Sequence, residues 1–242
     1  MELRIDARRT ALCLVAIVIA LAVAHVGGMV ARYVLNHEHA FGLIDTFNLN
    51  FENNVPTFFT TFMLVACAAL LAVIARHSAA ADGGAAYWKW LAIVFLFLAV
   101  DEDASLHELL IQPMREHLPF AGPLYFAWVV PYGLAVLVVG LVYLKFVRSL
   151  PVRTRRLFVA AGSVYLAGAL GFEFAGGWYL SRGEASEDLA YSLLVAAEEA
   201  LEMSGLVLFI YALLDHLRQR LGGEALRIRI PAAAGETGCP PR

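Results

Sequence analysis

Long runs of apolar residues, separated by short polar segments, dominate the chain. Six such runs occupy residues 11–35, 55–75, 89–112, 125–147, 157–180 and 190–216. A helix of about 20 residues crosses the roughly 30 Å hydrocarbon core of a bilayer, so each run is long enough to span a membrane. The pattern therefore predicts an all-α polytopic membrane helix bundle with six transmembrane helices over residues 1–217. Residues 218–242 are rich in Gly, Ala and Pro and are predicted to form a flexible cytoplasmic tail.

The composition agrees with a membrane protein. Hydrophobic residues make up 60% of the 242 residues and charged residues only 16%, whereas soluble domains carry about 25% charged residues. We therefore expect the lipid bilayer to surround the protein. No basic domain stands out, which argues against nucleic-acid binding. The cysteines are Cys13, Cys67 and Cys239; their spacing suggests neither a disulfide nor a metal site, and we assign them no role.

The distribution of Lys and Arg orients the predicted helices. With the N-terminus in the cytoplasm, 15 of these 18 residues fall on the inner side and 3 on the outer side. Because Lys and Arg favour cytoplasmic loops, both termini are predicted to be cytoplasmic, in a bacterial inner membrane. Residues 1–24 also resemble a signal peptide, and its cleavage would leave five spans in the same orientation. We favour an uncleaved first helix, because the apolar run continues to Leu35.

Acidic side chains interrupt these apolar runs at eight positions. They are Asp101, Glu102, Asp103, Glu108, Glu173, Glu198, Glu199 and Glu202. Each costs about 2.5–3.5 kcal/mol at the centre of a membrane helix, so such residues usually serve a function. With a rise of about 1.5 Å per residue, all of them fall between the bilayer midplane and the outer surface. We therefore predict one shared site that opens toward the periplasmic side.

The residue types in this predicted site favour metal binding, because carboxylates and imidazoles on facing helices form the di-metal sites of helix bundles. Asp103 and His107 share a face if the helix continues through them, as do Glu198 and Glu202. The predicted ligands of a divalent metal ion are Asp101, Asp103, His107, Glu173, Glu198 and Glu202. The residues predicted to support the site are Glu52, Asn54, Glu102, Ser105, Glu108, Glu199 and His25. Oxygen ligands suit Mg²⁺, Ca²⁺ or Mn²⁺ and added imidazole admits Zn²⁺ or iron, so the identity of the metal stays open.

Three functions are consistent with this pattern. The favoured one is a metal-dependent membrane enzyme that acts on a lipid or lipid-soluble substrate. The first alternative is a proton- or cation-coupled transporter, because chains of acids relay protons through membrane bundles. Against it, the inner halves of the predicted spans carry almost no polar residues. The second alternative is a non-catalytic membrane subunit or scaffold, which leaves the clustering of the acids unexplained. The chain contains no P-loop, G-x-S-x-G or H-E-x-x-H motif.

Three segments, residues 51–60, 101–108 and 198–203, carry a resemblance to a family of uncharacterised bacterial multi-pass membrane proteins. The resemblance covers most of residues 41–217. It implies no activity, because none is assigned to that family.

A more distant similarity is to the membrane hydrolases of the alkaline ceramidase and progestin/adipoQ-receptor superfamily. The residues that loosely match its motifs are Glu52, Asn54, Thr57 and Asp101. That superfamily holds zinc with three histidines, two of which form His-x-x-x-His on the last helix. This chain has Glu198 and Glu202 at the comparable place, which counts against zinc amidase activity.

Overall fold

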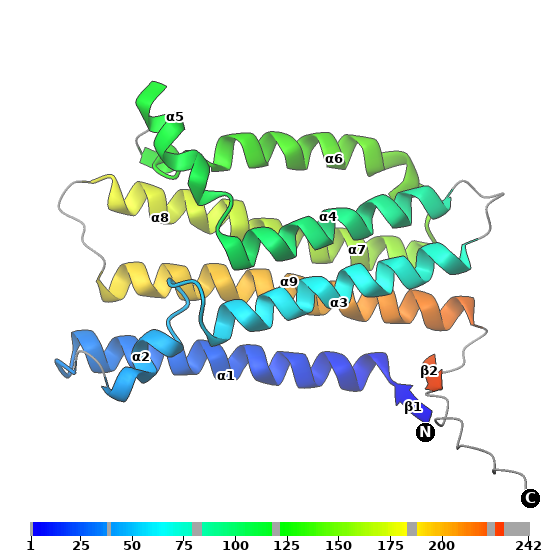
Figure 1. The fold of residues 1–242 in the computed structure, drawn as a ribbon, viewed down its shortest axis with the longest axis horizontal. Coiled ribbons are helices and arrows are strands. Elements are labelled where there is room, and N and C mark those ends of the chain that lie inside the picture. Colours follow the sequence, from blue (N-terminus) through cyan, green and yellow to red (C-terminus); the bar gives the residue numbers. More distant parts are fainter. Residues whose placement is uncertain are drawn as a thin grey trace, which may run out of the picture.

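The structure is a computed structural model that describes residues 2–37, 40–78, 84–117, 122–182, 188–221 and 226–229. Most of the predicted tail, residues 222–225 and 230–242, therefore lies outside the described residues. The described chain is almost entirely helical, and its long helices run side by side along the long axis of the molecule (Figure 1). This confirms the all-α, membrane-like character that the apolar runs predict.

Five helices are long and apolar enough to cross a membrane within the described part of the chain. They are α1 (Ala7–Tyr33), α3 (Val55–His77), α4 (Gly84–Ala104), α6 (Val129–Ser149) and the continuous helix Val152–Leu180. The last consists of α7 (Val152–Leu166), a π-helical segment η5 (Ala167–Phe172) and α8 (Glu173–Leu180). The sixth predicted span falls within α9 (Leu189–Arg220), which carries three glutamates and is not one of these five helices.

Short elements connect or extend the long helices. They are β1 (Glu2–Ile5), η1 (Ala40–Gly42), α2 (Leu43–Thr46), η3 (Glu108–Leu110), α5 (Ile111–His117), η4 (Gly122–Leu124) and β2 (Leu226–Arg229). The strands β1 and β2 pair in an antiparallel ladder, with Leu3 opposite Ile228. The pairing places the beginning of α1 and the chain beyond α9 at the same end of the bundle (Figure 1).

Side-chain caps set the beginnings of three helices. Asp6, Asn54 and Asp188 accept hydrogen bonds from backbone N–H groups in the first turns of α1, α3 and α9. These caps satisfy N–H groups that have no partner inside the helix. Asn54 also donates from its side-chain amide to the carbonyl oxygens of Asn48 and Phe51, at 2.6 and 2.9 Å. It therefore shapes the loop that precedes α3.

The helix α9 forms the centre of the bundle. It packs against α1, α3 and α7, and its second half is buried almost throughout. Met203 and Leu213 of α9 are fully enclosed, as are Met63 and Leu71 of α3. In contrast, α6 lies at the edge of the bundle and has buried residues only near its two ends (Figure 1). The long helices therefore differ in how much of their surface is buried: α9 is largely enclosed, whereas the middle of α6 is not.

Two glycines allow the helix α7–η5 to approach α9 closely. A Cβ atom placed on Gly168 would lie 2.7 Å from the carbonyl oxygen of Glu198 and 2.8 Å from Cγ of Glu202. A Cβ atom on Gly205 would lie 2.7 Å from the backbone nitrogen of Tyr165. Small residues at such crossings let backbones meet. The contact brings η5 directly against the stretch of α9 that carries the glutamates.

The third predicted span, residues 89–112, ends earlier than predicted. The helix α4 stops at Ala104, and Ser105 adopts the left-handed conformation with a φ of 51°. The chain then turns back, and the backbone N–H of His107 donates a hydrogen bond to Oδ1 of Asp101. The predicted helical pair of Asp103 and His107 therefore does not form, because the helix that would align the two side chains ends between them.

Candidate metal centre and membrane cavity

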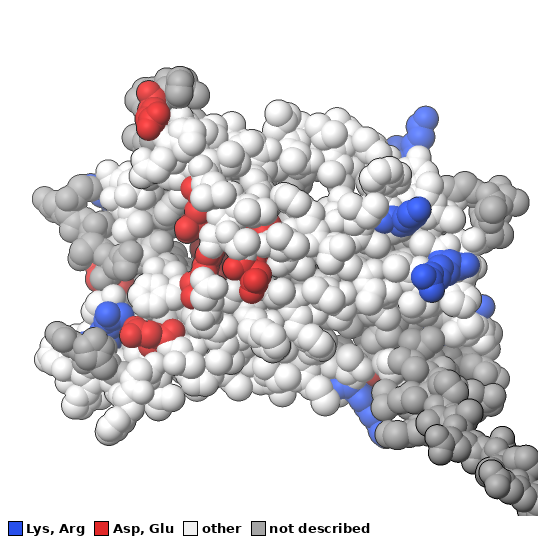
Figure 2. All heavy atoms as spheres, in the orientation of Figure 1, with Lys and Arg blue, Asp and Glu red and all other residues white. Residues whose placement is uncertain are grey.

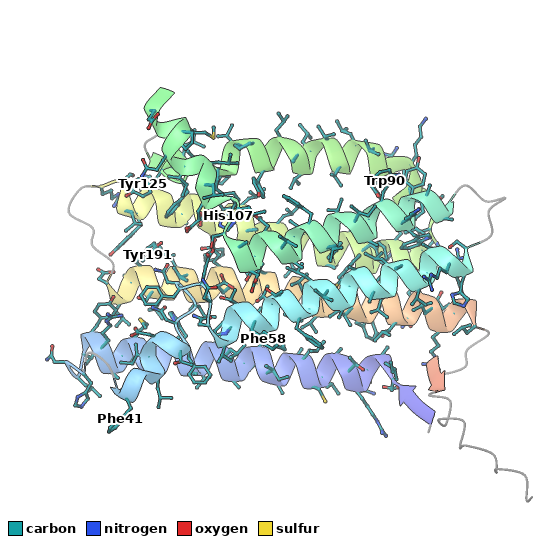
Figure 3. The ribbon with its side chains drawn as sticks, in the orientation of Figure 1. Phe41, Phe58, Trp90, His107, Tyr125 and Tyr191 are labelled. Atoms are coloured by element: carbon teal, nitrogen blue, oxygen red, sulfur yellow. The ribbon has the colours of Figure 1, made fainter. Side chains whose placement is uncertain are left out.

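A cavity of about 690 Å³ lies between α3, α4, α6, α7–α8 and α9. Its volume falls in the usual range of about 300–1,000 Å³ for ligand pockets. At one end the walls are acidic, and along α6 and the first half of α7 they are apolar. Figure 3 shows His107 on the turn after α4, at the same end of the molecule as Tyr125 and Tyr191. The polar end of the cavity is thus the end that the sequence predicts to face outward.

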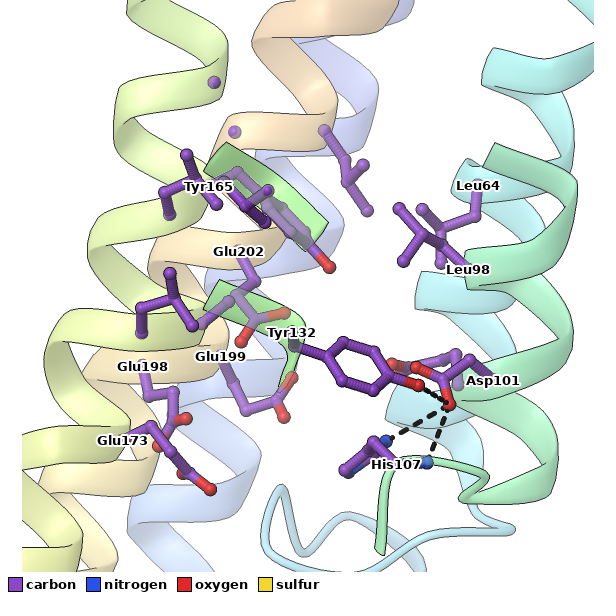
Figure 4. A pocket seen from close by; sticks show the side chains of 18 of the residues that line it. Leu64, Leu98, Asp101, His107, Tyr132, Tyr165, Glu173, Glu198, Glu199 and Glu202 are labelled. Atoms are coloured by element: carbon purple, nitrogen blue, oxygen red, sulfur yellow. Dashed lines mark hydrogen bonds and ion pairs between the residues drawn. The ribbon is translucent and has the colours of Figure 1, made fainter. Parts of the chain in front are cut away.

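The cavity brings together most of the residues that the sequence singles out. Among the predicted ligands, its wall includes Asp101, His107, Glu173, Glu198 and Glu202. Among the supporting residues, it includes Glu52, Glu102, Glu108 and Glu199. Figure 4 shows the glutamates of α8 and α9 facing Asp101 and His107 across the cavity. Side chains from four separate parts of the sequence thus share one space.

Asp101 is buried and anchors the C-terminal end of α4. Its Oδ1 atom accepts hydrogen bonds from the backbone N–H of His107, at 2.8 Å, and from the hydroxyl of Tyr132, at 2.9 Å. The ring Nδ1 of His107 lies 3.5 Å from the same oxygen. Asp101 therefore fixes the turn after α4, the orientation of the His107 ring and the position of α6 (Figure 4).

Glu52, His107 and Glu108 form a group in which one ligand atom of each residue lies within 4.8 Å of the others. Burial and the nearby charge of Glu108 raise the pKa of Glu52 above its ordinary value. Burial lowers the pKa of His107, but the hydrogen bond and charge of Asp101 outweigh burial, so the net shift is upward. The upward shift of the His107 pKa reflects the negative charge around its ring, which also favours a bound cation.

The carboxyl groups on α8 and α9 form a second polar group beside the first. Glu173 accepts a hydrogen bond from the indole Nε1 of Trp128 at 2.9 Å, and its carboxyl group also hydrogen-bonds to that of Glu198. The hydroxyl of Tyr165 hydrogen-bonds to Glu202. Two neighbouring carboxylates repel each other, and a proton or a cation between them relieves the repulsion. The arrangement is therefore suited to holding positive charge.

Four of the predicted residues do not face the cavity. Asp103 is exposed on the end of α4, and Ser105 forms the turn that follows it. Asn54 caps α3. His25 is 1% exposed and both of its ring nitrogens are occupied, since Nδ1 accepts from the N–H of Leu49 at 3.0 Å and Nε2 donates to the carbonyl of Ser192 at 3.1 Å. His25 therefore joins α1 to α9 and is not available as a ligand.

Sequence reasoning missed the aromatic partners of the carboxylates. Trp128 lies at the beginning of a predicted span, where tryptophan is expected as a membrane-interface anchor. Tyr132 and Tyr165 lie within apolar runs and resemble ordinary core residues. The only signal for the two tyrosines in the sequence is their predicted depth in the bilayer, which is close to that of the acidic residues. Their hydrogen bonds to Asp101 and Glu202 become visible only in three dimensions.

Opposite charges gather at opposite ends of the molecule. On the face shown in Figure 2, the acidic side chains cluster near the C-terminal end of α4, whereas most Lys and Arg side chains lie at the end where the strands meet. Arg32 is an exception and lies 3.8 Å from Asp45. The basic end is the one that the sequence predicts to be cytoplasmic.

Comparison with known proteins identifies a family but no activity. Residues 11–217 match the family model described as Domain of unknown function (DUF8692). No curated protein and no solved structure matches the chain. The match includes every residue that lines the cavity, from Leu49 before α3 to Phe209 of α9. The chain therefore belongs to the DUF8692 family, a family whose function is not known, as its resemblance to uncharacterised membrane proteins predicts.

Proposed function

We propose that this membrane protein binds a divalent metal ion at the acidic end of its cavity. The observation that carries the proposal is the group formed by Glu52, His107 and Glu108, whose ligand atoms lie within 4.8 Å of one another. Two carboxylates and one imidazole can supply three ligands, which leaves a position for a carboxylate of the facing wall or for water. Their ligand types fit Zn²⁺, iron or Mn²⁺ better than Mg²⁺ or Ca²⁺, which prefer oxygen ligands.

The orientation of His107 supports this assignment. Its Nδ1 faces the carboxylate of Asp101, at 3.5 Å, which leaves Nε2 free of that contact and suited to bind the ion. Metal-binding histidines usually donate their other ring N–H to a carboxylate, which fixes the ring and makes it a stronger ligand. We therefore assign Asp101 the role of orienting His107. Glu173, Glu198 and Glu202 are the proposed ligands on the other wall, whereas Asp103 does not line the cavity.

The proposal extends to an enzyme that acts on a lipid or lipid-soluble substrate. A bound divalent ion would polarise a carbonyl or phosphoryl oxygen, or activate a water molecule. The cavity continues from the acidic end into apolar walls, so a substrate with a polar head and an apolar body fits its two parts. Transport of protons or cations is disfavoured, because no charged residue lines the cavity below its acidic end.

We further propose six spans with both termini in the cytoplasm of a bacterium, and a site that opens to the periplasmic side of the inner membrane. The pairing of β1 with β2 supports an even number of crossings. The guanidinium of Arg220 donates to the hydroxyl of Ser78 at 3.1 Å, so α9 ends beside the end of α3. The hydroxyl of Tyr179 donates to Asp188 at 2.8 Å, so α9 begins beside the end of α8. Both contacts favour α9 as the sixth span.

The alternative of a cleaved first helix is disfavoured by packing. Leu14, Val18 and Leu21 of α1 are buried against the rest of the bundle. Removing residues 1–24 would expose this surface of the core. We therefore propose that α1 stays in the mature protein.

Metal analysis of the purified protein tests the central proposal. Inductively coupled plasma mass spectrometry on wild type, His107→Ala and Glu198→Gln should find a stoichiometric divalent metal in wild type and loss of it in both variants. Asp103→Asn is the matched control, because Asp103 lies on the same helix end but outside the cavity. Wild-type protein that binds no metal, even after incubation with Zn²⁺, Mn²⁺ or Fe²⁺, would overturn the proposal. Metal content that is equal in all four proteins would also do so.

A further inference from the structure

The apolar part of the cavity forms a distinct arm beside α6. Its walls include Val94 and Leu98 of α4, Val136 and Val139 of α6, Val159 of α7 and Leu206 of α9. No charged residue lines this arm below the acidic end. Such walls offer water no hydrogen bonds, whereas burying apolar surface against them is favourable by about 25 cal/mol per Å². The arm is therefore suited to a hydrocarbon occupant.

The helix α6 is fastened at its two ends and not between them. At the outer end, Tyr132 and Trp128 hydrogen-bond to Asp101 and Glu173. At the inner end, the hydroxyl of Tyr143 donates to the carbonyl of Tyr87 at 2.9 Å. The buried residues of α6 are Val129 and Phe146, near these ends. The middle of the helix has an inner face toward the cavity and an outer face toward the bilayer, so lipid chains lie close to the arm.

The length of the arm suits one lipid chain. From Val136 to Val147, the residues of α6 that line the cavity below its acidic end, the helix rises about 17 Å, at about 1.5 Å per residue. This is close to half of the roughly 30 Å hydrocarbon core, which is the depth that one lipid chain occupies. Toward the inner end, Tyr143 and Phe158 line the cavity and make edge-to-face contacts with Phe146 and Trp88, and we take this cluster of rings as the end of the arm. A chain would therefore enter the arm and stop.

We propose that the arm binds the hydrocarbon chain of a membrane amphiphile, which enters laterally from the bilayer beside α6. The oxygen-bearing head of the same molecule then lies at the acidic end, near His107 and Glu198. The role given to the head rests on the proposed metal site, whereas the binding of the chain rests on the apolar arm alone. This assigns the substrate class of the site as single-chain amphiphiles or lipids that present one chain.

Two glycines allow the arm to be filled without disturbing the acidic end. Gly140 of α6 and Gly162 of α7 line the cavity, and a Cβ atom on either has no other atom within 4 Å. Leucine at either position would occupy the arm, and it also favours a helix more than glycine does. Gly133 of α6 has the same open surroundings but does not line the cavity. Gly133→Leu is therefore the matched control for Gly140→Leu and Gly162→Leu.

The test uses hexadecanol that carries a photoactivatable diazirine in its chain, added to the full-length protein in detergent. Labelled residues are mapped by mass spectrometry, with and without an excess of unlabelled hexadecanol. Wild type and Gly133→Leu should show labelling at Val136, Val139 or Tyr143 that the excess removes. Labelling of the outward residues Leu137 and Leu141 should persist. In Gly140→Leu and Gly162→Leu the removable labelling should fall by at least about tenfold, since excluding a few methylene groups lowers affinity by that factor.

Metal content measured on the same samples separates this inference from the proposed function. If Gly140→Leu and Gly162→Leu keep wild-type metal but lose the removable labelling, the lipid arm is supported independently of the metal. If wild type holds no metal but shows the same labelling pattern, the metal proposal fails and the arm stands. Removable labelling that is absent in wild type, or unchanged in both glycine variants, would overturn the inference. Stronger competition by farnesol than by hexadecanol would assign an isoprenoid chain.

Discussion

The carboxylate of Asp101 and the imidazole of His107 face one another across the turn that ends α4. One oxygen, Oδ1, lies 2.8 Å from the backbone nitrogen of His107 and 3.5 Å from its ring Nδ1. The same side chain thus closes the turn and orients the ring. Because Ser105 adopts a left-handed conformation between them, the two residues meet although they are not spaced to share a helical face.

Replacing Asp101 by Asn should lower the pKa of His107. In wild type the hydrogen bond and charge of Asp101 outweigh burial and raise this pKa above the ordinary value of about 6.5. Asparagine can still accept the hydrogen bonds but carries no charge, so burial would then dominate. Histidine resonances followed by NMR in the metal-free protein should show the shift. Metal affinity should fall by about 10–100-fold, as for other residues that orient a ligand.

The same pair predicts a dependence of stability on pH. A histidine whose pKa is raised on folding contributes stability that is fully present below its unfolded pKa and is lost as the pH rises through the folded pKa. Thermal unfolding in detergent should therefore show the largest difference between wild type and Asp101→Asn below pH of about 6.5. A difference that grows toward alkaline pH would contradict this account of the pair.

Gly168→Ala should destabilise the protein and weaken metal binding together. The added methyl group would lie 2.7 Å from the carbonyl oxygen of Glu198, so α9 or η5 must move. Such overpacking costs about 1–3 kcal/mol, and the movement displaces Glu198 and Glu202. Gly171→Ala is the control in the same π-helical segment, because nothing lies within 4 Å of its Cβ position. Unfolding temperature and metal content report the two effects.

Equal unfolding temperatures for Gly168→Ala and Gly171→Ala would show that the crossing of η5 and α9 tolerates an extra methyl group. If Gly168→Ala instead lost metal but kept its stability, the contact between η5 and α9 would serve only to position the glutamates. Because η5 and α9 lie so close together at Gly168, we expect both the unfolding temperature and the metal content of Gly168→Ala to fall.

The helical fold follows closely from the apolar runs, because hydrophobic length is the main constraint that a bilayer imposes. The early end of α4 does not follow from them. Its residues after Ala104 continue a helical pattern, and the break depends on Ser105 and on the hydrogen bond from His107 back to Asp101. The position at which α4 ends therefore depends on a few specific contacts. The pattern of apolar residues does not record these contacts, so the sequence predicts a longer helix.

The acidic part of the site was also predictable, because ionisable residues in membrane helices are costly and therefore conspicuous. The partners that hold them were not. Tyr132 is 31 residues from Asp101 and Trp128 is 45 residues from Glu173. Nothing local marks either contact. His25 is a converse case: the sequence predicts that it supports the site, whereas both of its ring nitrogens contact backbone groups, of Ser192 and Leu49.

His25→Ala should reduce stability and leave metal binding unchanged in the folded protein. The change leaves the N–H of Leu49 and the carbonyl of Ser192 without their side-chain partner. A buried polar group that loses its partner costs about 1–3 kcal/mol. Thermal unfolding should show the loss, and metal analysis of the remaining folded protein should give the wild-type stoichiometry. Reduced metal content in well-folded His25→Ala protein would show that His25 takes part in the metal site.

The proposed topology predicts that the two ends of α9 lie on opposite sides of the membrane. Ser78 at the end of α3 receives a hydrogen bond from Arg220, whereas Ser181 follows α8. Single-cysteine variants Ser78→Cys and Ser181→Cys, made after replacing the 3 native cysteines by serine, can be treated in spheroplasts with a membrane-impermeant maleimide. Only Ser181→Cys should react, and Ser78→Cys should react after the membrane is opened. This pattern is expected because Lys and Arg favour the cytoplasmic side. The reverse pattern would show that the protein has the opposite orientation in the membrane. Reaction at both positions in spheroplasts would show that α9 does not span the membrane.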